Sequence, residues 1–274
     1  MQTHIKDLSY VYHGTNGSAV ILIHGMTGSP IEMKFVAKRL HRQGFTVYVP
    51  TLAGHGRDEA TFVGSTWQDW YQTVEETLTE ALKSHDKVYA AGLCVGGTLG
   101  LFLAHKNPKA VQAVTLYSAT IHYDGWNTPF YFKYAHLLVP VGIRIPFLRN
   151  IRISDSYPHG IKSERIRRIL VKRNKDAGDN LEGALPNIPV RGLHENYKLN
   201  HVLKKILPSI TTPTLLLHAR EDDVSSPQNS YYIKDRLGGI GEVQLLEDSY
   251  HLICVDQERD KVSDLTAQFF LRHP

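Results

Sequence analysis

A cysteine lies between closely spaced glycines at the end of an apolar run. The run 88–93 leads directly into Gly92-Leu-Cys94-Val-Gly96, which fits the pattern glycine, any residue, nucleophile, any residue, glycine. In such a pattern a strand turns sharply into a helix and holds the central side chain above the sheet in a strained backbone conformation. The spacing therefore predicts Cys94 as a nucleophile. It also predicts that the Val95 N–H, at a helix N-terminus, faces the carbonyl oxygen under attack.

An acid and a histidine follow later in the chain, in the order that this chemistry requires. Asp222 comes after an apolar run, and His251 comes after the last such run. A general base must reach the nucleophile, and a carboxylate must orient that base. The chain has 15 histidines, so position rather than residue type selects His251. We predict His251 as the base, with Glu221, Asp222 or Asp223 as the carboxylate partner; spacing alone does not choose among these three acids.

A glycine-bearing loop follows the first apolar run. His24-Gly-Met26-Thr-Gly28 comes directly after residues 19–23. Such a loop can present a second backbone donor to the same oxyanion, so we predict this role for the Met26 N–H, with a plain turn as the alternative. Gly54-His-Gly56 lacks the third glycine of a dinucleotide-binding loop and is predicted to shape a turn.

Apolar runs alternate with helical patterns over most of the chain, which predicts an α/β fold with a mostly parallel sheet and helices on both faces. The expected strands are residues 19–23, 45–49, 88–93, 111–117, 212–217 and 243–246. The expected helices are residues 30–43, 67–82, the segment after Cys94 and a C-terminal segment around 262–269. Residues 1–120 and 208–274 are expected to form this core.

Residues 121–207 interrupt the alternation and are predicted to form an inserted, mostly helical cap without a clear strand. The segment begins with many aromatic residues, among which Trp126 is a candidate substrate contact. It then becomes basic between Lys162 and Lys175. This basic stretch could bind the phosphates of acyl-CoA or an acidic acyl carrier protein. The alternative is a solvated helix face.

The composition limits the classes of function. The net charge of +4 is too small to indicate nucleic-acid binding. The N-terminus is polar and no run of about 18 apolar residues occurs, so we expect a cytoplasmic protein without a transmembrane segment. Only two cysteines are present, and Cys254 is expected to be a packed thiol. No spacing typical of a metal site occurs, and no cofactor is expected.

Five segments together resemble the small bacterial carboxylesterases and monoacylglycerol lipases of the α/β-hydrolase superfamily. They are residues 22–28, 54–56, 92–97, 219–224 and 249–252. The resemblance covers the predicted core but not the cap. It implies Cys94 as nucleophile, Asp222 as acid, His251 as base, and Met26 and Val95 as oxyanion donors. The chain departs from that family in one respect, because Cys94 stands where the relatives carry serine.

Cysteine remains a competent nucleophile, because a thiolate forms beside a histidine and a helix N-terminus. We therefore expect a hydrolase that cleaves a carboxylic ester or thioester through acyl-Cys94. The alternative is an acyltransferase that passes the acyl group to an amine or alcohol, as superfamily members with a cysteine at this turn imply. Two further interpretations are a binding protein without catalysis and an introduced Ser→Cys replacement. The sequence does not predict the acyl chain length.

Overall fold

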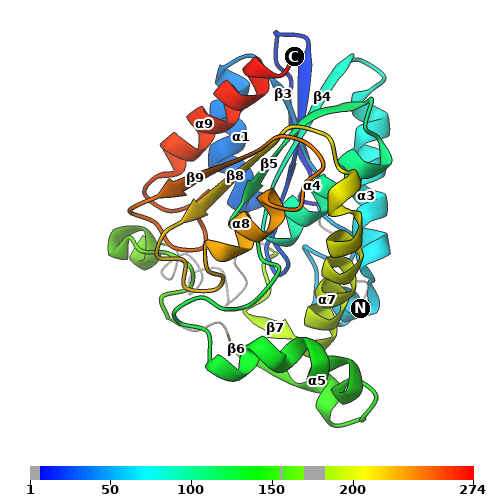
Figure 1. The fold of residues 1–274 in the computed structure, drawn as a ribbon, viewed down its shortest axis with the longest axis vertical. Coiled ribbons are helices and arrows are strands. Elements are labelled where there is room, and N and C mark those ends of the chain that lie inside the picture. The colour runs from blue at the N-terminus through cyan, green and yellow to red at the C-terminus, as the bar shows by residue number, and fades with distance from the viewer. Residues whose placement is uncertain (1–6, 155–156, 170–182) are drawn as a thin grey trace.

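The core of the protein is a seven-stranded sheet in the order β1-β3-β2-β4-β5-β8-β9. The computed structural model describes residues 7–154, 157–169 and 183–274 (Figure 1). The strands are β1 Tyr10–Tyr12, β2 Ser18–Ile23, β3 Thr46–Val49, β4 Lys87–Leu93, β5 Val111–Tyr117, β8 Thr214–Ala219 and β9 Gly241–Leu246. β1 pairs antiparallel with β3 at one edge, and the other neighbours are parallel. The predicted α/β fold with a mostly parallel sheet is confirmed.

The strand that carries the nucleophile lies at the centre of the sheet. β4 pairs with β2 on one side and β5 on the other, and Gly92 is in register with Ile23 and Leu116. Almost every residue of these strands is buried, as expected for a parallel sheet covered on both faces. Cys94 therefore follows a buried central strand that is paired on both sides.

Helices cover both faces of the sheet (Figure 1). α1 Lys34–Arg42 and α9 Arg259–Arg272 pack together, while α3 Trp67–Ala81 packs with α4 Val95–Lys106. Two shorter helices, α2 Glu59–Gly64 and α8 Gln228–Lys234, were not predicted, and neither was strand β1. The expected helix 30–43 begins as a 3-10 turn, η1 Pro30–Met33, before α1. Proline at its first position suits that start.

The predicted cap region contains helices and also a pair of strands. Its described elements are η2 Phe130–Tyr134, α5 Ala135–Gly142, η3 Leu148–Asn150, β6 Arg152–Ser154, β7 Asn187–Pro189 and α7 Val190–Ile206. β6 and β7 form a separate antiparallel sheet, a pair of strands that was not predicted. Strands of three residues are too short to show an alternating pattern. Figure 1 shows these elements beyond one end of the main sheet, with α7 reaching back alongside it.

Among the described residues, no helix is both long enough and apolar enough to cross a membrane.

Candidate active site

Cys94 occupies a sharp turn that only its glycine neighbours permit. Its backbone has φ 52° and ψ −114°, a left-handed conformation that is costly for any residue other than glycine. A Cβ at Gly92 would collide with the backbone of Gly96, and one at Gly96 would collide with the carbonyl oxygen of Ile23. The two glycines thus let the start of α4 lie directly against β4 and β2. The turn holds the Cys94 side chain at the carboxyl end of the sheet, where it is 7% exposed.

His251 and Asp222 lie together at the same end of the sheet. Nδ1 of His251 is 3.0 Å from Oδ1 and 2.9 Å from Oδ2 of Asp222. The Cys94 thiol is close enough to the same ring to raise the pKa of His251. Because Nδ1 faces the carboxylate, Nε2 is the nitrogen left for the thiol. The structure therefore brings together all three residues that the sequence singled out for the reaction.

The Asp222 carboxylate is held by four donors in a buried setting. The backbone N–H groups of Val224 and Ser225 each donate to Oδ1 at 2.8 Å, His218 Nε2 lies 3.2 Å from Oδ2, and His251 Nδ1 is the fourth donor. Burial works against ionisation, but the charge of His251 and these hydrogen bonds hold the pKa of Asp222 well below its usual value. Asp222 is therefore a carboxylate that cannot easily turn away from His251.

The same ion pair acts on the histidine. Burial alone would lower the pKa of His251, but the Asp222 carboxylate and Cys94 together raise that pKa well above its usual value. A raised pKa favours the protonated form of the His251 ring. The site can therefore stabilise an imidazolium at His251 when that ring accepts a proton.

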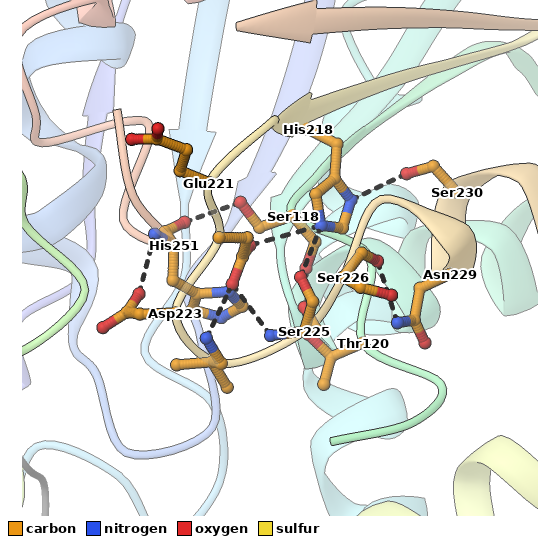
Figure 2. Close-up of polar contacts among 12 residues, drawn as sticks. Ser118, Thr120, His218, Glu221, Asp223, Ser225, Ser226, Asn229, Ser230 and His251 are labelled. Carbon is orange, nitrogen blue, oxygen red and sulfur yellow. Dashed lines mark hydrogen bonds and ion pairs between the residues drawn. The ribbon is translucent and has the colours of Figure 1, made fainter. Parts of the chain in front are cut away.

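The three candidate acids have different positions. Asp222 faces the ring of His251, whereas Asp223 accepts hydrogen bonds from the backbone N–H of His251 at 3.2 Å and of Gly160 at 3.0 Å. Glu221 is exposed and pairs with Lys162 at 2.7 Å. Asp223 therefore holds the backbone of His251 (Figure 2), whereas Asp222 is the one of the three acids that faces the imidazole.

The loop predicted to carry the second oxyanion donor is fixed by two buried histidines. His24 Nδ1 is 2.9 Å from the Gly25 carbonyl oxygen, and His24 Nε2 accepts the Leu52 N–H at 3.1 Å. His55 Nε2 is 2.5 Å from the Met26 carbonyl oxygen. In the described part of the chain, the N–H groups of Met26 and Val95 donate to no protein acceptor. Both donors thus remain available to a ligand.

Burial keeps both of these histidines neutral. It lowers the pKa of His24 to about 3, with a contribution from neighbouring His55, and lowers the pKa of His55 to about 4. Their rings are 4.9 Å apart. Sequence analysis assigned no separate role to His24 and only a turn to His55. A signal for their role was present in the sequence, because histidine stands beside glycine both in residues 24–28 and in residues 54–56. Glycine has no side chain, so nearby backbone carbonyls are accessible to an imidazole ring.

The other predicted contacts are engaged within the chain. Trp126 is 57% exposed, donates through Nε1 to the Glu221 carbonyl oxygen at 2.9 Å and lies against Tyr250. This placement anchors the first part of the predicted cap, and a substrate contact of Trp126 stays a prediction.

The basic stretch is also partly used for internal contacts. Lys162 pairs with Glu221 and Asp248, Arg168 pairs with Glu164, and the Arg167 guanidinium lies over the Tyr157 ring. Lys172, Arg173 and Lys175 lie outside the described residues. Nothing here supports the expected acyl-CoA or acyl-carrier-protein contact.

The second cysteine lies below the surface. Cys254 has 0% exposure, and burial raises the pKa of its thiol well above the usual value. Over residues 7–154, 157–169 and 183–274, no group of three or more His, Cys, Asp or Glu side chains could hold a metal ion.

Comparison with known proteins identifies relatives along nearly the whole chain. Residues 14–258 match the sequence profile of the family described as "Serine aminopeptidase, S33". The chain is 25% identical to the thermostable monoacylglycerol lipase of Bacillus sp. (strain H-257) over 264 residues, 96% of this chain and 94% of the lipase. It is 24% identical to the carboxylesterase of Bacillus subtilis (strain 168) over 254 residues, 92% of this chain and 91% of the esterase.

A solved structure agrees in fold. The monoacylglycerol lipase of Paleococcus ferrophilus superposes with a TM-score of 0.79 at 18% identity, covering 98% of this chain and 100% of the lipase. Since the family profile spans most of the sequence and the sheet, turn and site have the arrangement described above, the chain belongs to the serine aminopeptidase S33 family of α/β hydrolases.

Proposed function

We propose that this protein hydrolyses carboxylic esters through a covalent acyl-thioester on Cys94. The observation that carries the proposal is the placement of Cys94 at the strained turn, within reach of a His251 ring whose other nitrogen faces Asp222. The lipase and esterase named above support esters as the substrate class. Serine is the usual nucleophile in such relatives, so the thiol is the distinctive part of the proposal.

Acylation follows from the positions of the groups. The Cys94 thiol passes its proton to His251 Nε2, and the thiolate attacks the ester carbonyl carbon. The carbonyl oxygen becomes an oxyanion, for which we assign the Met26 and Val95 N–H groups as donors. The tetrahedral intermediate collapses, the C–O bond to the alcohol breaks, and the leaving alkoxide takes the proton from His251. The products are the alcohol and an acyl-Cys94 thioester.

Deacylation repeats the sequence with water. His251 accepts a proton from water, and the resulting hydroxide attacks the thioester carbonyl carbon. The second tetrahedral intermediate uses the same two donors. The C–S bond then breaks and His251 returns its proton to the thiolate, which regenerates Cys94 and releases the carboxylic acid.

We further propose that residues 121–207 act as a cap on the core formed by 1–120 and 208–274. Gly160 of this segment donates to Asp223 and accepts a hydrogen bond from Leu252 N–H at 2.8 Å, immediately beside His251. The segment therefore touches the loops that carry the acid and the base. In this role it would border the bound ester and limit access of water.

Intact-mass spectrometry tests the covalent step. The protein is mixed with p-nitrophenyl esters of short acids and with a monoacylglycerol, alongside Cys94→Ala, Cys94→Ser and, as a matched thiol control, Cys254→Ala. We expect a transient acyl adduct that the Cys254→Ala variant retains and the Cys94→Ala variant lacks, with free acid as the final product. Turnover that survives in Cys94→Ala would contradict the mechanism. An adduct that water does not clear, but an added alcohol or amine does, would contradict hydrolysis.

A further inference from the structure

A glutamate lies under the loop that carries Met26, and the mechanism above does not use it. Glu32 belongs to η1, and its Oε1 accepts a hydrogen bond from the Gly25 N–H. The residue is partly buried, and its carboxyl group is enclosed by the loop. A Cβ at Gly28 would collide with Oε2, so glycine at this position leaves the space that the carboxyl group fills. The loop from 25 to 28 is thus wrapped around this one side chain.

The pKa of the Glu32 carboxyl group also depends on the charge of His251. Burial raises the pKa of Glu32 to about 7, while the Gly25 N–H and the charge of His251 oppose that rise. The second titratable group beside it is the Cys254 thiol, whose pKa is raised by burial and by the negative charge of Glu32. Leu93, which also borders Gly25, is apolar. The charge of His251 is therefore near enough to lower the pKa of the Glu32 carboxyl group.

We propose that Glu32 is a positioning residue that connects the oxyanion loop to the charge on His251. Its carboxylate fixes the loop through Gly25, the neighbour of the Met26 donor, and it is a second negative charge, besides Asp222, that favours the imidazolium. The inference rests on the proposed function, because it assigns Glu32 to the same reaction.

The physical reason is that a positive charge on His251 and a negative charge on the oxyanion both develop during the reaction. His251 becomes positively charged when Cys94 gives up its proton, and the oxyanion forms as the thiolate attacks the carbonyl carbon. A donor array helps only if it is already in place, because a preorganised array needs no rearrangement as charge develops. A carboxylate that stabilises the imidazolium while it holds the loop serves both needs.

Two substitutions separate the two parts of the role. Glu32→Gln keeps an oxygen that accepts from Gly25 N–H but removes the charge, whereas Glu32→Ala removes both. Glu258→Gln is the matched control, because Glu258 also accepts backbone N–H bonds, from Glu247 and Asp248, on the segment before His251. Thermal melting of each variant checks folding.

The measurement is the rate at which iodoacetamide alkylates Cys94 from about pH 5 to about pH 10, with the modified peptide identified by mass. Cys254 serves as the internal unreactive thiol. The wild-type profile is expected to contain an ionisation near neutrality that Glu32→Gln lacks and Glu258→Gln retains. The pH at which the imidazolium loses its proton should fall by about one unit in Glu32→Gln, because a neutral amide no longer stabilises it.

The steady-state rates provide the second readout. With a p-nitrophenyl ester, Glu32→Ala should lower kcat/KM at least about tenfold more than Glu32→Gln, through loss of the loop contact. A Glu32→Gln profile identical to the wild type, or the same change in Glu258→Gln, would overturn the inference. The alkylation assay does not depend on ester turnover. A wild-type protein that shows the Glu32 ionisation but cleaves no ester would therefore contradict the proposed function and still support the electrostatic role of Glu32.

Discussion

His218 and His251 share one oxygen of Asp222. Oδ2 of this carboxylate is 2.9 Å from His251 Nδ1 and 3.2 Å from His218 Nε2. His218 Nε2 is also 2.9 Å from the Ser225 carbonyl oxygen, and its Nδ1 is 2.8 Å from the Ser230 hydroxyl. Two acceptors at Nε2 assign the proton to that nitrogen, so Nδ1 accepts from Ser230 (Figure 2). His218 therefore donates to the acid that orients the base.

Replacing His218 should impair the reaction without touching the substrate. We expect His218→Phe to lower kcat/KM about tenfold or more, because Asp222 loses one donor and can turn away from His251. His218→Gln, which can restore a donor, should recover part of the loss. Ester hydrolysis and thermal melting of both variants check this expectation. Equal rates for the wild type and His218→Phe would mean that the backbone donors of Val224 and Ser225 suffice.

Neighbouring aspartates should respond differently to the same substitution. Asp222→Asn is expected to lower kcat by about 10³-fold or more, because the amide cannot stabilise the imidazolium and favours the wrong tautomer. Asp223→Asn should act mainly on stability, since it weakens the hold on the backbone of His251 and Gly160. Rates and unfolding free energies of the two variants give the comparison. A larger loss of kcat in Asp223→Asn would reverse the assignment of the acid.

Acid should loosen the oxyanion loop. His24 and His55 have pKa values of about 3 and about 4 in the folded protein, below the usual 6.5. The unfolded chain therefore binds protons first, and the stability that these rings contribute is present above pH 6.5 and is lost as the pH falls toward about 4. Each ring should account for up to about 3 kcal/mol.

The variant His55→Gln tests that window. It keeps a donor for the Met26 carbonyl but does not titrate, so its unfolding free energy should depend less on pH between about 6.5 and about 4 than that of the wild type. Urea unfolding at several pH values measures the slopes. Parallel slopes would show that the pKa of His55 is the same in the folded and unfolded chains.

Replacing the glycine in the tight turn should be costly, whereas replacing a glycine that borders open space should not. Gly96→Ala would push a methyl group into the backbone of Ile23 and His24, so we expect a loss of about 3 kcal/mol or more, or no folded protein. Gly64→Ala is the matched control, because no atom lies within 4 Å of its Cβ position at the end of α2. That variant should keep the wild-type stability within about 1 kcal/mol. Chemical denaturation of both proteins decides the matter, and similar losses would show that helix propensity rather than the close approach controls the effect.

The predictable part of this site is the part encoded by local pattern. The turn at Cys94 could be read from the sequence, because flanking glycines and a buried strand leave few other structures for that segment. The order of Asp222 and His251 along the chain follows from the fold. Asp222 and Asp223 could not be separated in this way. They are adjacent on one loop, and only the direction of each side chain in the folded loop distinguishes them.

The residues that support the site were beyond sequence reasoning. Glu32 and His218 are ordinary polar residues near ordinary elements, and their importance depends on contacts with Gly25 and Asp222 that only tertiary packing creates. The β6–β7 pair was missed for a related reason, since its register depends on segments more than thirty residues apart (Ile153 opposite Ile188).

Asp223 connects Gly160, in the middle of the chain, to the backbone of His251. Its two oxygens hold the N–H groups of His251 and Gly160, and the Gly160 carbonyl in turn accepts from Leu252. Separating Gly160 from this loop would break two hydrogen bonds and leave the buried Asp223 carboxylate with one partner. Gly160 is therefore anchored to the loop that carries the base. A ligand that displaced Gly160 would also strain the backbone of His251 and alter the orientation of its ring.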